Sequence, residues 1–162
     1  MQTTTDFARQ LHDARQFKRL RELRERAALS ALHAAEAALQ TAIQVMQERR
    51  ATILRLQNER HTLAERIVGE LAPDMVRLVD YVSALQFKLD DRLERAEYAL
   101  IDDQQAVAEA QVKVNKARQA WLQTVSRHGA AGTLVDDANQ ALRRDREVRA
   151  EREDLPQSMQ IA

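Results

Sequence analysis

A heptad repeat runs through the second half of this sequence and leaves few folds open to the chain. Alternate steps of four and three residues from Met75 reach fifteen positions, of which twelve are apolar. These positions are Met75, Val79, Val82, Gln86, Leu89, Leu93, Ala96, Leu100, Asp103, Val107, Ala110, Val114, Ala117, Trp121 and Thr124. A 3.5-residue spacing sustained over about seven heptads is typical of a left-handed coiled coil. A helix over residues 73–128 would extend for roughly 84 Å, so we expect it to lie along a partner helix.

Glycine and proline interrupt helices, and the chain has only three glycines and two prolines. Gly69 and Pro73 predict a short break between a first helix over about residues 5–68 and a second over about 73–128. Proline suits the first position of a helix, where its missing N–H costs nothing. Two long helices joined by a short break favour an antiparallel hairpin. The alternative is one continuous kinked helix that dimerises in parallel.

A second break is expected where Gly129 and Gly132 stand close together. A third, weakly amphipathic helix would follow over about residues 134–153. We therefore expect a hairpin domain over residues 1–128, followed by a helical extension and tail over residues 129–162.

The composition agrees with an all-α fold: a long two-helix antiparallel coiled-coil hairpin with a short C-terminal helical extension. Charged residues make up 31% of the 162 residues and aromatic residues only 4%, and good helix formers dominate. The chain has no cysteine, and its four histidines show no metal-ligand spacing. No catalytic motif is present. We expect neither an enzyme nor a cofactor or metal site, and no direct membrane insertion.

The first helix carries a less regular apolar seam. Its middle part follows a four-three step, with two successive steps of three after Gln57, through Leu32, Glu36, Leu39, Ile43, Met46, Arg50, Ile53, Gln57, Arg60, Leu63 and Ile67, with Leu56 beside the seam. Nearer the N-terminus, a thinner core face is expected from Phe7, Leu11, Phe17, Leu20, Leu23 and several alanines. Asp103 is a lone acidic residue on the second helix's seam, where a polar side chain can fix the register.

Basic residues are concentrated near the start of the chain. Residues 7–26 hold seven cations and three acids, a net charge of +4, although the whole chain is neutral. The cations are either a solvated helix face or a docking surface for an acidic protein. Nucleic acid is not expected as a partner, because no aromatic residues suited to base stacking lie among the cations. The candidate surface comprises Arg15, Lys18, Arg19, Arg21, Arg24 and Arg26, with Trp121 from the second helix as core or anchor.

The predicted turn is flanked by more apolar residues than one seam requires. Either they pack locally against the end of the first helix, or they form a docking patch at the tip of the hairpin. The candidate tip residues are Leu71, Met75, Val76, Leu78 and Tyr81.

The Arg-rich segment over residues 7–26 (FARQLHDARQFKRLRELRER) and the heptad helix over residues 75–124 resemble the FliJ/YscO/HrpO group. These are central-stalk proteins of flagellar and virulence type III secretion systems. The resemblance implies that the end with both termini enters a hexameric export ATPase. It also implies that the tip reaches the cytoplasmic domain of the export gate, and that secretion chaperones are further partners. The protein would then act in the cytoplasm, peripheral to the inner-membrane apparatus.

Two other functions remain open on the sequence. The chain could be a self-associating structural tether or scaffold unrelated to secretion, in which case a dimer would double the 18.5 kDa mass. An adaptor that uses its basic segment on a membrane surface or nucleic acid is the weakest alternative, and it would show steep salt dependence.

Overall fold

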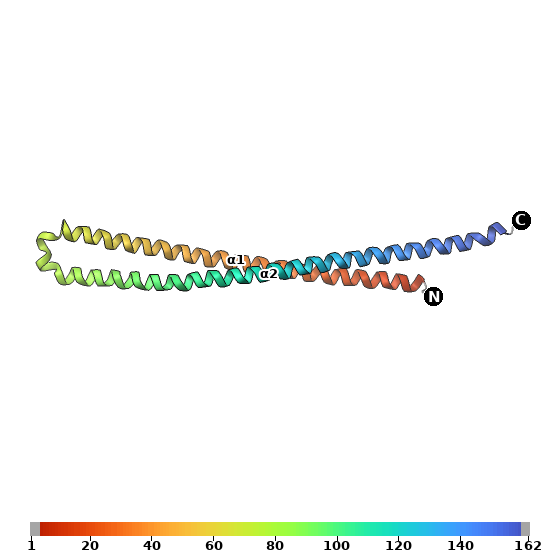
Figure 1. The fold of residues 1–162 in the computed structure, drawn as a ribbon, viewed down its shortest axis with the longest axis horizontal. Coiled ribbons are helices and arrows are strands. Elements are labelled where there is room, and N and C mark those ends of the chain that lie inside the picture. The colour runs from red at the N-terminus through yellow and green to blue at the C-terminus, as the bar shows by residue number, and fades with distance from the viewer. Residues whose placement is uncertain (1–3, 160–162) are drawn as a thin grey trace. The chain divides into compact units, whose positions relative to one another are not determined.

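The computed structural model describes residues 4–159, which are almost entirely helical and contain no strand. Helix α1 spans Thr4–Val68, a short 3-10 helix η1 spans Ala72–Asp74, and helix α2 spans Met75–Met159 (Figure 1). The two long helices pack against each other. The predicted all-α helical hairpin is therefore confirmed.

The turn between α1 and α2 lies where Gly69 and Pro73 predict it. The Gly69 and Leu71 amides donate hydrogen bonds to the carbonyl oxygens of Glu65 and Arg66, at 3.0 and 2.8 Å. No glycine in the described chain has a positive φ, so the turn does not depend on left-handed backbone. Pro73 lies in the first turn of η1, a position where the missing N–H leaves no hydrogen bond unmade.

The predicted break at Gly129 and Gly132 is wrong, because α2 continues through both residues without interruption. The heptad step carries on past Thr124 in the same phase and buries Ala131 completely. Val135 and Leu142, further along this step, are also buried. Each glycine costs a helix about 1 kcal/mol relative to alanine, a penalty that the continued apolar seam outweighs. The residues after 128 are thus a continuation of α2 and not a separate helix.

The chain forms two compact units, each containing a part of α1 and a part of α2. The tip unit is Ala34–Asn115, and the terminal unit combines Met1–His33 with Lys116–Ala162. The core of the tip unit consists of Ile53, Leu56, Leu63, Leu89, Leu93 and Ala96. In the terminal unit, the core contains Leu11, Val135 and Leu142, flanked by Phe7, Ala14 and Ala138.

The seam of α1 differs from the prediction at three positions, Arg50, Gln57 and Arg60, which are exposed, whereas Glu36 and Ile43 are partly buried as expected. From Leu32 onward the steps run three then four, through Ala35, Leu39, Ala42, Met46, Arg49, Ile53 and Leu56, all buried or partly buried. Arg50 and Gln57, predicted on the seam, are exposed, whereas Leu56 is only 2% exposed. Both orders share every seventh residue, so the apolar pattern alone left them nearly equivalent.

The start of α2 contains a related error. Val79 and Gln86 were expected on the seam but are exposed. Leu78 and Leu85, one residue earlier in each case, are partly buried in their place. From Leu89 the predicted positions are buried or partly buried as far as Thr124, including Asp103.

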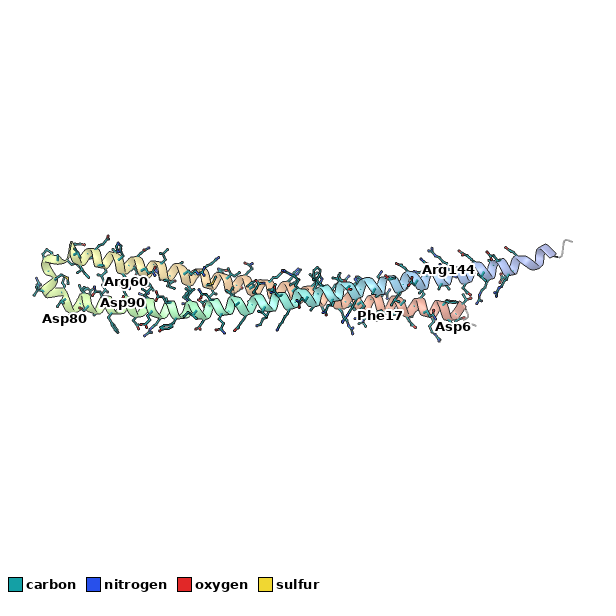
Figure 2. All side chains as sticks on the ribbon, in the orientation of Figure 1. Asp6, Phe17, Arg60, Asp80, Asp90 and Arg144 are labelled. Atoms are coloured by element: carbon teal, nitrogen blue, oxygen red, sulfur yellow. The ribbon has the colours of Figure 1, made fainter. Side chains whose placement is uncertain are left out.

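Two ion pairs connect α1 and α2 in the tip unit. The Arg49 Nε donates a hydrogen bond to the Asp103 carboxylate at 3.0 Å, and the Asp103 side chain is only 14% exposed. The lone acidic residue of the seam therefore has a basic partner on the opposite helix. The second pair joins Arg60 to Asp90 at 3.4 Å, with both side chains more than half exposed (Figure 2). An exposed pair of this kind is worth only about 0–1 kcal/mol.

Polar contacts also connect the helices in the terminal unit. The Thr4 hydroxyl donates a hydrogen bond to the Asp145 carboxylate at 2.9 Å. His128 Nδ1 and the Glu25 carboxylate form a close contact in which both side chains are partly buried. The first of these contacts joins the first turn of α1 to a residue of α2 beyond the glycine pair, and the second joins a residue that precedes that pair to the middle of the terminal part of α1.

Candidate partner-binding surfaces

The basic segment of α1 presents one strongly cationic face in the terminal unit. Arg15, Lys18, Arg19 and Arg26 are all exposed, and their spacings of three, four and eleven residues place them on the same side of the helix. Glu22 shares this face and pairs with Arg26 at 2.7 Å. Four cations and one acid give the face a net charge of +3, so it can attract an acidic partner.

Arg21 and Arg24 do not belong to this face. Arg24 is exposed on the opposite side of α1. Arg21 is partly buried, its Nε is fully buried, and its guanidinium lies 4.7 Å from the centroid of the Phe17 ring. Because of this burial and the cation–π contact, the guanidinium of Arg21 is less available to a partner than the exposed cations are.

The same segment of α1 also carries three exposed apolar side chains. Phe17, Leu20 and Leu23 are 39%, 44% and 61% exposed, although the sequence pattern placed them on a core face. That expectation is wrong, because the partly buried positions here are Ala14, Arg21 and other residues of the Leu32 phase. Phe17 and Leu20 lie on the same side of α1 as Arg24, away from the basic face, and Figure 2 labels Phe17. Exposed apolar groups of this kind suit protein docking better than the cations alone would.

Trp121 lies on the α2 seam of the same unit and is partly buried. Its indole N–H is buried and finds no acceptor among the described residues. The hydroxyl of Thr124 donates to the Trp121 carbonyl oxygen at 2.6 Å, a contact within the helix. This environment fits packing in the seam better than the role of an exposed anchor.

The tip residues divide into two groups. Leu71, Met75 and Leu78 are partly buried, as local packing against the end of α1 requires. Val76 and Tyr81 point to solvent and are 92% and 68% exposed. The sequence prediction missed Val68, the last residue of α1, which is 82% exposed beside the turn. Val68 lies at the end of a helix and off the apolar seam, and this position could have indicated that its side chain is exposed.

Among the residues described, no three His, Cys, Asp or Glu side chains lie close enough to hold a metal ion. Within residues 4–159, neither long helix contains a stretch whose length and hydropathy suit a transmembrane span.

Comparison with protein-family models, with curated proteins and with solved structures gives no match for this chain.

Proposed function

We propose that this protein is a non-enzymatic stalk or adaptor of a type III secretion apparatus. It would link the hexameric export ATPase to the cytoplasmic domain of the export gate, with secretion chaperones as further partners. Its site of action would be the cytoplasm, at the periphery of the inner-membrane apparatus. The observation that carries the proposal is a helical hairpin with an exposed basic face in its terminal unit and an exposed apolar patch in its tip unit.

The terminal unit is assigned to the ATPase. Its basic face, Arg15, Lys18, Arg19 and Arg26, would meet acidic side chains of the ring. Charge complementarity of this kind speeds association and selects partners more than it adds affinity. The tip unit is assigned to the export gate, through the exposed side chains of Val76 and Tyr81.

The test is an affinity capture of tagged protein from its source cell, with partners identified by mass spectrometry. Recovery of a hexameric export ATPase and a gate component is the expected result. The variant Arg15→Glu/Lys18→Glu/Arg19→Glu should lose the ATPase and keep wild-type helicity, because all three side chains are exposed. The matched control reverses three exposed arginines of α2 in the same unit: Arg143, Arg144 and Arg146. Capture of neither partner by the wild type, or equal losses in variant and control, would refute the proposal.

Self-association as a structural tether is the second candidate. It is favoured by large exposed apolar side chains on α2 of the tip unit: Phe87, Tyr98 and Ile101 are 75%, 65% and 59% exposed. Light scattering with size-exclusion chromatography distinguishes the two functions. A stalk is expected near 18.5 kDa, and a tether at twice that mass or more.

A further inference from the structure

An open groove of about 670 Å³ runs along one side of the tip unit. It lies between residues 51–66 of α1 and residues 85–92 of α2. Four leucines contribute to its lining: Leu54, Leu63, Leu85 and Leu89. Leu63 and Leu89 belong to the core and present only an edge to the groove, whereas Leu54 is 58% exposed. Leu54 thus offers most of its side chain to whatever occupies the groove.

The leucines of the groove differ in their relation to the seam. Leu63 and Leu89 are part of the buried core of the tip unit, and Leu85 packs against it. Leu54 lies off the α1 seam, which passes through Ile53 and Leu56. On α2 the seam takes two successive steps of four, from Leu85 to Leu89 and then to Leu93. An inserted step of four locally unwinds a coiled coil.

The rim of the groove is cationic. Arg55, Arg66, Lys88 and Arg92 line it, and Glu59 is the one acidic lining residue. Four cations and one acid give a net charge of +3 in a chain whose total charge is zero. Glu59 lies 3.8 Å from Arg55, and Glu70, outside the lining, lies 3.2 Å from Arg66, so both arginines of the α1 rim have an acidic neighbour four residues further along the chain. An occupant with negative charge on both sides of an apolar strip would match this rim.

We propose that this groove binds an amphipathic α-helix of another protein, with its apolar stripe on the leucines and Asp or Glu on both flanks. A helix laid in a groove offers apolar side chains at positions i, i+3, i+4 and i+7, which suits a floor of separated leucines. The α1 wall from Ala51 to Arg66 is about 22 Å long, room for a helix of three to four turns. The bound helix would lie beside α1 and α2 as a third helix of the coiled coil.

The apolar floor favours a protein partner over nucleic acid. A phosphate backbone would use the four cations but would leave Leu54 against charged oxygens and water. An acidic helix uses both the cations and the leucines. This proposal rests on the groove alone, and it stands or falls independently of the proposed role in secretion.

The test titrates the full-length protein against a fluorescently labelled 18-residue helical peptide with leucine at positions i, i+3, i+4 and i+7 and glutamate on the flanks. The control peptide carries lysine in place of each glutamate. Fluorescence anisotropy should show at least tenfold tighter binding of the glutamate peptide at low salt. That preference should shrink at high salt, because the rim cations are exposed.

Two variants locate the binding. Leu54→Asp should weaken the glutamate peptide at least tenfold, and so should Lys88→Glu/Arg92→Glu, with helicity unchanged because these residues are exposed. Matched controls on exposed positions of the same unit and outside the groove lining are Val112→Asp and Arg50→Glu/Arg77→Glu, which should bind as the wild type does.

Three results would overturn the proposal: no binding of the glutamate peptide at 0.5 mM, equal affinity for both peptides, or affinity that the groove variants leave unchanged. A wild-type dimer that Leu54→Asp converts to a monomer would also overturn it, since a second copy would then be the occupant.

Discussion

Replacing Gly129 and Gly132 by alanine should stabilise this protein. Both glycines lie inside α2, and neither has a positive φ, so alanine can adopt the backbone conformation found there. A Cβ atom built at either position meets nothing within 4 Å. The substitution therefore adds no clash, and it removes backbone freedom that the unfolded chain would otherwise regain.

The size of the effect follows from helix propensity. Glycine is about 0.8–1.0 kcal/mol less favourable than alanine in a helix interior, so the double variant should gain about 1.5–2 kcal/mol. For a chain of this length, 1 kcal/mol raises the Tm by about 2–4 °C, which gives an expected rise of about 3–8 °C. The two substitutions should contribute additively to the free energy of unfolding, because a Cβ atom at either position meets nothing within 4 Å.

Circular dichroism at 222 nm during thermal and urea unfolding measures the change. Gly69→Ala is the control, because Gly69 lies in the turn, where helix propensity gives no gain. Its Cβ would stand 3.4 Å from the Glu65 carbonyl oxygen, an ordinary contact. That variant should change stability by less than about 0.5 kcal/mol.

A lower Tm in the double variant would refute this reasoning. It would mean that the chain needs a bend or a break at these two glycines, as their positions in the sequence first suggested. An unchanged Tm would be equally damaging, because a continuous helix cannot lose two interior glycines without gaining stability.

Leu93→Asp should lower the free energy of unfolding by more than about 4 kcal/mol and abolish most of the cooperative unfolding seen by circular dichroism. The reason is that Leu93 is only 6% exposed in the core of the tip unit. Arg49→Met should lower the free energy of unfolding by about 1–2 kcal/mol, because it leaves Asp103 without its partner. Arg49→Met combined with Asp103→Leu should recover wild-type stability in urea unfolding, and a double variant no more stable than the single variant would contradict this. Trp121→Phe should stay within about 1 kcal/mol of wild type, since it removes a buried N–H that lacks an acceptor, but Trp121→Ala should lose about 2 kcal/mol or more in the same assay.

The turn and both helices could be predicted from the spacing of glycine, proline and apolar residues. The 3.5-residue repeat required a partner for α2, and the break near Pro73 allowed α1 to supply it. The same reasoning failed at Gly129 because it weighed two glycines above the pattern around them. Ala131, Val135 and Leu142 continue the heptad step beyond Thr124 and are buried. The free energy gained by burying these side chains exceeds the helix-propensity cost of the two glycines.

The binding surfaces were harder to predict because they depend on which residues stay outside the seam. Phe17 and Leu20 look like core residues by hydrophobicity, yet they are exposed while Arg21 is partly buried. Where a charged residue occupies a seam position, counting apolar residues does not reveal which positions form the seam.

Charge matching between the helices provides information about register. In an antiparallel pair, residues that face each other have numbers with a nearly constant total. In the tip unit, Arg49 with Asp103 gives a total of 152 and Arg60 with Asp90 a total of 150. A total in this range pairs Asp103 with a residue near position 49, but it does not distinguish Arg49 from its neighbour Arg50. Searching for the total that aligns most opposite charges would therefore have given the approximate register of the two helices and left the three-four order open.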